Sequence, residues 1–255
     1  MIDNQQLSSE PILVVNEDSG VLSVTLNRPD SANALSPELV EALLNVFNNS
    51  GNCRLCIIRG NGQNFCAGFD LSDIEELSDG DLLWRFLRIE TLLQIIYHAK
   101  FPVIAFAHGH VVGAGADLFA ACWQRIASAD TKIKMPGWNF ELALGTRRLK
   151  NLIGADAARD LLIDTKTLYA DDAQKCGLIN QIEETERWPE IVDGISDRTK
   201  ALPLNALNQM FSITATDTRS EDLASIVKTA GYPGLKARVL DYRSRLNSAK
   251  RESQP

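Results

Sequence analysis

A run of five apolar residues, Val103 to Ala107, constrains the fold most, because glycines follow it at once and a helical pattern comes next. Five residues are too few for an amphipathic helix, so the run predicts a strand that is buried on both faces. Such strands are typical of parallel sheets, in which a helix-length crossover leads from one strand to the next. The segment therefore predicts an α/β protein whose sheet is covered by helices.

The same alternation of short strands and helices extends through the first half of the chain. Val21 to Leu26 alternates apolar and polar residues, as a half-buried strand does. Ser36 and Pro37 predict a helix start, with a capping side chain and a proline in the first turn. Further strands are expected at Leu55–Ile58, Arg125–Ala127 and Lys132–Met135, and further helices at about Leu82–Ala99 and Gly115–Cys122.

After Gly145 the pattern becomes almost wholly helical. No linker rich in proline, glycine or serine separates two cores, so one main body is expected. One short strand is expected at Leu178–Ile182. Helices are expected at Ala155–Thr165, Ala170–Cys176, Trp188–Ala201, Pro203–Thr214 and Gly234–Lys250.

The chain of 255 residues is 45% hydrophobic and carries a formal net charge of -7, a composition typical of a folded globular protein. The acidic balance argues against a general affinity for nucleic acid, which needs a surplus of lysine and arginine on one face. Met1 to Ser9 is polar, unlike a signal peptide, and no apolar run of about 18 residues is present to span a membrane. A cytoplasmic protein without a membrane partner is therefore expected.

The five cysteines form an odd set. Cys53 and Cys56 make a CxxC pair, but no second pair stands nearby to complete four zinc ligands. Reduced thiols that pack in the core are the better interpretation. Because the chain has three histidines, a histidine-rich metal site is not expected either.

Two corners that contain glycine carry the strongest functional signal. The first, Asn64 to Leu71, follows a strand, and the second, His108 to Asp117, follows the buried strand and opens a helix. Small residues let a ligand approach the backbone, and N–H groups at a helix start are ready donors to negative charge. Either corner alone is equally consistent with a tight turn. Neither has the spacing of a dinucleotide-binding or phosphate-binding loop.

The corners and several other segments, in their order along the chain, resemble the crotonase family, the enoyl-CoA hydratase/isomerase superfamily of acyl-CoA enzymes. The resemblance runs from about Ile12 to Ile182 by motif and through the helical tail by layout. So many matches in one order make it specific. The matching segments are Asn27-Arg28-Pro29, Asn33-Ala34-Leu35, Phe65–Leu71, Pro102–Ala105, Gly109–Leu118, Tyr169–Ala173 and Gly177–Asn180.

The resemblance implies the α/β crotonase (ClpP/crotonase-like) fold, a spiral of ββα units followed by a C-terminal helical region. It assigns the spiral core, with the CoA and acyl site, to residues 1–200, and helices for trimerisation and active-site cover to residues 201–255. It implies a homotrimer, or a hexamer made of two trimers. It also implies that the backbone N–H groups of Phe69 and Ala114 form an oxyanion hole for the carbonyl of a CoA thioester.

Asp117 is the leading candidate for proton transfer. It lies one helical turn after Ala114, at the position where family hydratases carry a catalytic glutamate. The alternative is a carboxylate that is favoured at a helix start by the helix dipole. The second family glutamate has no counterpart, because Gly137 follows Met135-Pro136 in a loop that looks about three residues short.

Glu141, from that altered loop, is the candidate for the missing second carboxylate, with apolar neighbours that would raise its pKa. The alternative is a solvated carboxylate or an ion-pair partner of Arg147 or Arg148. Glu90 is a weaker reserve candidate. His108 and His110 alternate along a strand and so point to opposite faces, which favours packing or interface roles.

The resemblance also implies a set of residues that contact the CoA moiety or the substrate. Asp30 stands where many relatives carry a cation near the CoA phosphates, so Arg28, or Lys236 or Lys250 from the C-terminal helix, would have to compensate. Trp138 is interpreted either as a wall of the acyl pocket or as a core indole. The implied contact residues are Arg28, Ser31, Ala32, Ala67, Gly68, Asp70, Leu71, Gly113 and Trp138.

The sequence therefore predicts an enzyme of the enoyl-CoA hydratase/isomerase type that stabilises a thioester enolate and moves protons with carboxylates. It needs no metal, and no cofactor beyond the CoA moiety of its acyl-CoA substrate. Hydrolysis of a CoA thioester or carbon–carbon cleavage on the same scaffold is the alternative enzyme class. A crotonase homologue that binds acyl-CoA without turnover is the non-enzyme alternative.

Overall fold

A twisted six-stranded sheet forms the centre of the protein, in a computed structural model that describes residues 10–252 and the side chains of residues 10–248. The strand order is β1-β2-β3-β4-β6-β9, and every neighbouring pair after the antiparallel β1-β2 hairpin is parallel. The prediction of a largely parallel sheet is therefore confirmed. Met1 to Ser9, the segment considered above as a signal peptide, lies outside the described residues.

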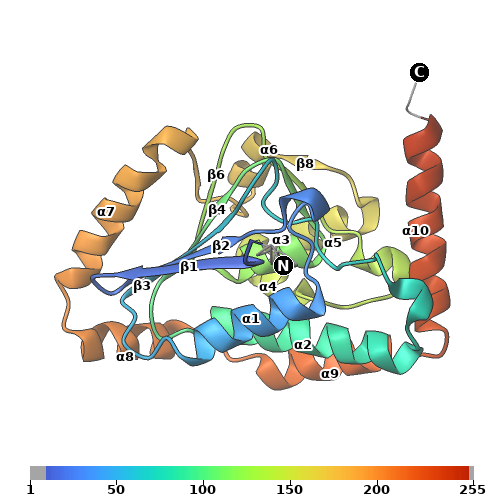
Figure 1. The fold of residues 1–255 in the computed structure, drawn as a ribbon, viewed down its shortest axis with the longest axis horizontal. Helices are drawn as coiled ribbons and strands as arrows, with labels where there is room; N and C mark the ends of the chain where they lie inside the picture. Colours follow the sequence, from blue (N-terminus) through green and yellow to red (C-terminus); the bar gives the residue numbers. More distant parts are fainter. Residues whose placement is uncertain (1–9, 253–255) are drawn as a thin grey trace, which may run out of the picture.

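The described elements follow one another along the chain as Figure 1 shows. The strands are β1 (Leu13–Asp18), β2 (Val21–Leu26), β3 (Leu55–Gly60), β4 (Val103–Ala107), β5 (His110–Val112), β6 (Gln124–Ala127), β7 (Lys132–Lys134), β8 (Leu168–Tyr169) and β9 (Gln181–Ile182). The α-helices are α1 (Pro37–Asn48), α2 (Asp79–Tyr97), α3 (Ala114–Ala121), α4 (Thr146–Ile153), α5 (Ala155–Asp164), α6 (Ala170–Lys175), α7 (Trp188–Lys200), α8 (Leu204–Thr214), α9 (Arg219–Ala230) and α10 (Leu235–Glu252).

Both faces of the sheet are covered, because successive side chains of each strand point in opposite directions. In β3, Cys56 and Ile58 join the large apolar cluster that includes α1 and α2, whereas Leu55 and Ile57 join a second cluster under α7. In Figure 1, α1 and α2 lie on one side of the sheet and α7 on the other. The strand is therefore buried on both faces, as its apolar run predicts.

A second, three-stranded sheet has the order β5-β7-β8. β5 lies within the second glycine corner and runs parallel to β7. Gly113 N–H, at the end of β5, donates to the carbonyl of Lys134 over 2.8 Å. The start of α3 is thus fixed by this small sheet.

Local signals account for several helix starts. Ser36 caps α1 by accepting a hydrogen bond from Leu39 N–H at 3.3 Å, with Pro37 in the first turn, which confirms the predicted start. α2 begins three residues before its predicted start, because Ser78 and Asp81 form a capping box ahead of the apolar pattern.

Several elements differ from the sequence prediction. β1 was not expected, since four of its six residues are exposed and its pattern does not alternate cleanly. α4 was not expected, because its polar sequence, with Arg147, Arg148 and Lys150, shows few apolar residues at helical spacing. α9 was not expected either. β9 covers two residues, whereas the buried residues Leu178 and Ile179 precede it in a turn.

The C-terminal helices pack onto the spiral core. Ile226 and Ala230 of α9 and Leu235 and Val239 of α10 belong to the large apolar cluster of the core. The carboxylate of Asp79, at the start of α2, accepts the N–H groups that open α10. The division of the chain at residue 200 stays a prediction, because these contacts continue across it.

No α-helix in residues 10–252 has both the length and the apolar character that crossing a membrane requires. The five cysteines are all free, and four of them are buried, as the interpretation as packing thiols requires. Burial raises the pKa of the Cys66 thiol to about 12, so this thiol stays protonated at neutral pH.

Gly115 provides a test of how closely the two corners pack. A Cβ added there would lie 2.5 Å from the carbonyl oxygen of Cys66, so we expect Gly115→Ala to force the corners apart. The expected loss of stability is about 1–3 kcal/mol, measured by urea denaturation. Gly194 is the matched control, because its added Cβ would meet nothing within 4 Å. Gly194→Ala, in the middle of α7, is expected to stabilise by about 0.5–1 kcal/mol. Equal effects of the two changes would contradict the packing described here.

Candidate active site

The two glycine corners are joined by backbone hydrogen bonds. Cys66 N–H donates to the carbonyl of His110 over 3.2 Å, and Val112 N–H donates to the carbonyl of Cys66 over 2.9 Å. The pairing forms an isolated parallel bridge between Cys66 and Val111. The corners, about 45 residues apart in the sequence, therefore form one continuous stretch of backbone.

Gly68 allows the closest approach between the corners. Its φ is +89°, and an added Cβ would lie 2.4 Å from the carbonyl oxygen of Val112 and 3.1 Å from the nitrogen of Ala114. A side chain at this position would therefore separate the nitrogens of Phe69 and Ala114. Ala114 opens α3, so its N–H has no partner within the helix. Neither this N–H nor that of Phe69 donates a hydrogen bond to another described residue.

Phe69, Ala114 and Asp117 border the same small cavity, which has a volume of about 40 Å³. Asp117 is the one acidic residue among its described lining residues. The rest of the wall is apolar or lacks a side chain, apart from the indole N–H of Trp138. The lining residues are Phe69, Phe86, Ala114, Asp117, Met135, Gly137, Trp138, Phe140, Leu142, Leu144 and Leu162.

The carboxyl group of Asp117 is buried without full hydrogen bonding. Asp117 is 5% exposed, and its Oδ1 has no hydrogen-bond partner among the described residues. Burial raises its pKa well above the usual value, Arg148 opposes this shift and Glu90 adds to it. A buried polar atom without a partner is costly, and such groups are enriched at functional sites.

Gly145 leaves the space that the Asp117 carboxyl occupies. A Cβ on Gly145 would lie 1.9 Å from Asp117 Oδ1, and the residue has a φ of +62° at the start of α4. Glycine is therefore required here for two reasons, the left-handed backbone and the contact with the acid. The sequence offered no signal for this contact, because the two residues are 28 positions apart.

A buried ion-pair network lies beside Asp117. Arg148, 2% exposed, donates to both carboxylate oxygens of Glu90, which is 1% exposed, and lies 3.4 Å from Asp222. Arg147 donates to Asp222 over 2.7 Å. Glu90, the reserve candidate, is therefore held by an arginine and does not line the small cavity. Arg148 was missed as a site residue because the sequence showed no helix around it.

Glu141 lies away from Asp117. It follows a short 3-10 turn over Gly137–Phe140 with a φ of 60°, and its side chain is 68% exposed. Its Oε2 lies 3.7 Å from Nε of Arg238 on α10, and it pairs with neither Arg147 nor Arg148. The structure thus does not bring the two candidate carboxylates together. Gly137 lines the cavity where the family's second glutamate is expected.

The segments assigned to CoA lie side by side. Ala67 N–H donates to the carbonyl of Ala32 over 2.9 Å, and Leu35 N–H donates to the carbonyl of Gly68 over 2.7 Å. The segments 28–35 and 66–71 therefore lie side by side, and the exposed parts of these two segments form one surface at the first corner. Ser31 is exposed on this surface.

Arg28 is held within this surface by Asp70. Its guanidinium lies 2.8 Å from the Asp70 carboxylate and also donates to the carbonyl of Ala34. Burial tends to raise the pKa of Asp70, but hydrogen bonds from Ser72 and Arg28 outweigh it and lower the pKa. Arg28 is thus committed to a protein carboxylate.

Cations of α10 lie close to the same surface. Arg243 donates to the carbonyl of Leu71 over 3.4 Å and pairs with the Glu75 carboxylate, and the Lys236 ammonium donates to the carbonyl of Glu75 over 2.7 Å. The side chain of Lys250 lies outside the described residues. The role of a C-terminal cation at the CoA phosphates stays a prediction.

Trp138 lines the cavity with 42% of its surface exposed, and its indole N–H donates to Thr146 over 3.1 Å. This position fits a pocket wall better than a core indole. His108 lies 2.8 Å from the carbonyl of Gly62 through Nε2, and His110 is exposed. Neither histidine borders the small cavity.

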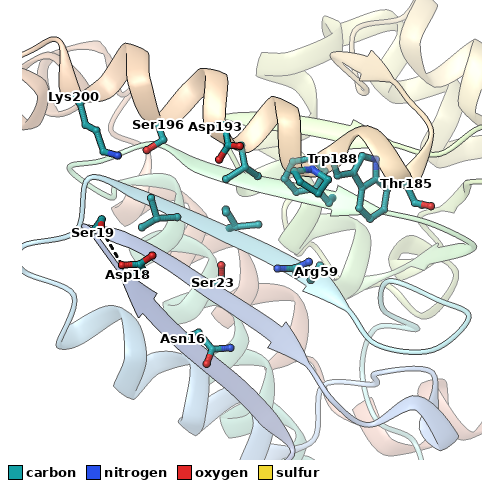
Figure 2. Close-up of a pocket in the computed structure, with 15 residues that line it drawn as sticks. Asn16, Asp18, Ser19, Ser23, Arg59, Thr185, Trp188, Asp193, Ser196 and Lys200 are labelled. Carbon is teal, nitrogen blue, oxygen red and sulfur yellow. Dashed lines mark hydrogen bonds between the residues drawn. The ribbon is translucent and has the colours of Figure 1, made fainter.

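A separate cavity of about 450 Å³ lies between β1–β3 and α7 (Figure 2). Its charged groups are of mixed sign, Asp18 and Asp193 against Arg59 and Lys200. None of its lining residues belongs to the two glycine corners. It is therefore not part of the candidate active site.

The sheet topology and the paired corners define an α/β enzyme with the crotonase fold. A family model described as enoyl-CoA hydratase/isomerase matches residues 16–221. The chain therefore belongs to the enoyl-CoA hydratase/isomerase family.

Individual relatives agree with this membership. A structure from Bordetella parapertussis, provisionally named an enoyl-CoA hydratase/isomerase, is 36% identical with a TM-score of 0.89, over 96% of this chain and 99% of that one. The short-chain-enoyl-CoA hydratase of Clostridium acetobutylicum is 28% identical over 188 residues, 68% of this chain and 69% of the relative. The mitochondrial Delta(3,5)-Delta(2,4)-dienoyl-CoA isomerase of Dictyostelium discoideum is 27% identical over 218 residues, 79% of this chain and 73% of the relative. The chain thus resembles both hydratases and isomerases.

The raised pKa of Asp117 predicts a pH-dependent cost in stability. Between the ordinary pKa of an unfolded aspartate and the raised pKa in the fold, folding takes up a proton, so stability falls as pH rises through this range. Asp117→Asn removes this titration. We therefore expect the variant to gain stability over the wild type as pH rises from about 4 to 8, in urea denaturation across that range. A stability difference independent of pH would contradict a neutral, buried Asp117.

The buried ion pair predicts a large effect of losing its cation. Arg148→Met leaves Glu90 buried and uncompensated, so we expect a loss of roughly 3–5 kcal/mol in unfolding free energy. Arg187 is the matched control, because its pairs with Glu183 and Glu190 are exposed. Arg187→Met is expected to cost less than about 1 kcal/mol. Similar losses from the two changes would show that Arg148 is not paired in a dry interior.

Proposed function

We propose that this protein acts on acyl-CoA thioesters by forming an enolate, and that the reaction is the migration of a carbon–carbon double bond. The N–H groups of Phe69 and Ala114 bind the thioester oxygen, and Asp117 moves the proton. The observation that carries this proposal is the small cavity, in which Asp117 is the one carboxyl group among the described residues.

Two backbone donors suit this chemistry because negative charge develops on the thioester oxygen when a proton leaves the α carbon. Donors that are already aimed at that oxygen stabilise the enolate more than the neutral carbonyl. A single such donor lowers a barrier by about 3–4 kcal/mol in other enzymes. The backbone ladder between the corners supplies the rigidity that this stabilisation needs.

A single carboxylate in an apolar cavity favours isomerisation over hydration. Addition of water uses two coordinated groups, whereas double-bond migration needs one group that takes a proton and returns it. In a 3-enoyl thioester, the ionised form of Asp117, which the raised pKa makes less populated but a stronger base, takes a proton from the α carbon, and the electron pair is delocalised as a dienolate. The same proton is returned to the γ carbon, which leaves a conjugated 2-enoyl thioester and an ionised Asp117. No atom is gained or lost.

The CoA moiety is proposed to lie along residues 28–32 and 67–71, which the structure holds side by side. Because Arg28 is bound to Asp70 and Arg243 to Glu75, the phosphates are proposed to meet Lys236 of α10, whose ammonium donates to a backbone carbonyl. The reaction is proposed to need no cofactor beyond the CoA of the substrate. A trimer or hexamer, a cytoplasmic location and a role in fatty acid metabolism also remain part of the proposal.

Substitution of the acid tests the proposed reaction. Asp117→Asn removes the proton carrier and keeps the size of the side chain, so kcat is expected to fall by about 10²–10⁴-fold. The assay offers a 3-enoyl-CoA and follows the conjugated thioester by ultraviolet absorbance. Binding of a saturated acyl-CoA to the variant, measured by calorimetry, is expected to stay within a few-fold of wild type.

Glu141→Gln is the matched control, because Glu141 is exposed beside Arg238. This variant is expected to keep its rate within about threefold of wild type. Full activity of Asp117→Asn would contradict the proposed acid. Release of free CoA, detected with a thiol reagent, would instead identify a hydrolase. Binding of acyl-CoA without any turnover would identify a non-catalytic homologue.

A further inference from the structure

A further cavity, with a volume of about 660 Å³, lies next to the candidate active site. Three helices each turn one face toward it. α4 contributes Thr146, Arg147 and Lys150, α5 contributes residues of 155–162, and α9 contributes residues of 222–229. A volume of this size is in the range of cavities that bind small molecules.

This cavity borders the small cavity that contains Asp117. Trp138 and Leu162 line both of them. Gly145 also lines the large cavity, and its backbone lies directly against the Asp117 carboxyl. The acyl chain of a bound thioester can therefore extend beyond its reacting carbons into this cavity.

The wall of the large cavity is apolar near Asp117 and cationic toward solvent. Ala143, Ala158 and Leu162 supply the apolar part. Four cations and two carboxylates complete the lining, which makes a locally positive site on a chain of net charge -7. The cations are Arg147, Lys150, Arg159 and Lys228, and the carboxylates are Glu90 and Asp222.

Two of these cations are available to a ligand. Arg147 is engaged by Asp222, and Arg159 pairs with Asp156 at the surface. Within residues 10–248, no carboxylate lies within 4.0 Å of the ammonium group of Lys150 or of Lys228. Glu90 is already neutralised by Arg148. An anionic group at the mouth of the cavity would therefore meet a net positive charge.

We propose that this cavity binds the far end of the acyl chain and selects chains that end in a carboxylate, with Lys150 and Lys228 as the residues that recognise it. The inference rests on the proposed function, since it names the substrate class of the same site. The apolar wall holds the methylene groups, and the two ammonium groups hold the terminal carboxylate. A terminal methyl group would gain nothing from these lysines.

The CoA phosphates are the other anions that this substrate carries. The proposed function puts them elsewhere, at Lys236 of α10, whose ammonium donates to the carbonyl of Glu75 beside the 67–71 segment. None of these residues lines the large cavity. The acyl terminus is therefore the anion that this cavity suits.

Binding of matched thioesters by calorimetry tests the inference. Saturated ligands avoid turnover, and the pairs hexanoyl-CoA with adipoyl-CoA and octanoyl-CoA with suberoyl-CoA differ only in the terminal group. Wild-type protein is expected to bind the carboxylate-ended member of at least one pair about tenfold more tightly, because two half-solvated ion pairs form. The double variant Lys150→Glu with Lys228→Glu is expected to lose this preference and to keep its affinity for the methyl-ended member within about threefold.

The control is Lys132→Glu with Lys200→Glu, which makes the same change in net charge at exposed lysines away from this cavity. It is expected to keep the tenfold preference. Equal binding of both members by wild type, or the same loss in the control, would overturn the inference and leave the proposed function intact. Weaker binding of free CoA to the Lys150/Lys228 variant would show that the lysines bind phosphate, which also overturns it. Failure of wild type to bind any of the thioesters would instead reject the proposed function.

Discussion

The short ladder of backbone hydrogen bonds between the two glycine corners is the constraint on which the rest of the site depends. It fixes Cys66 against Val111 and lets Gly68 bring Phe69 close to Ala114. Because both partners are main-chain groups, this geometry needs small residues more than particular side chains. The ladder also continues into the small sheet, because Val111 pairs with Cys66 on one side and with Ile133 of β7 on the other. Rigidity at this point is what a pair of preorganised donors requires.

Asp117 acquires its chemical character from what surrounds it. An aspartate in water would be ionised at neutral pH, but here apolar side chains and the backbone of Gly145 exclude water from the carboxyl group. The nearest cation, Arg148, is already shared with Glu90 and Asp222, so it compensates the burial only in part. The same arrangement that makes the acid unfavourable for stability raises its proton affinity, which is the property that the proposed proton transfer uses. The buried arginine is thus both a structural cation and a neighbour of the candidate acid.

Much of this could be predicted from the sequence, because the signals were local. Three signals each lie within a few consecutive residues: the apolar run of β4, the Ser36-Pro37 cap and the glycine corners. They predicted the sheet, the start of α1 and the site that contains Asp117. Glu141 shows the limit of local patterns, since its exposed side chain pairs with Arg238, a residue of α10 that is distant in the sequence. The contact of Gly145 with Asp117 and the Glu90–Arg148 ion pair could not be predicted from the sequence either. Each depends on how α2, α3 and α4 pack, which no local pattern of residues encodes.

The absence of a side chain at Gly145 couples positions 117 and 145, which are distant in the sequence. The carboxyl group at position 117 fits only because position 145 carries no side chain, and a longer acid would extend into the same backbone. The length of the acidic side chain on α3 and the absence of a side chain at the residue before α4 therefore depend on each other. A change at either position requires a compatible residue at the other.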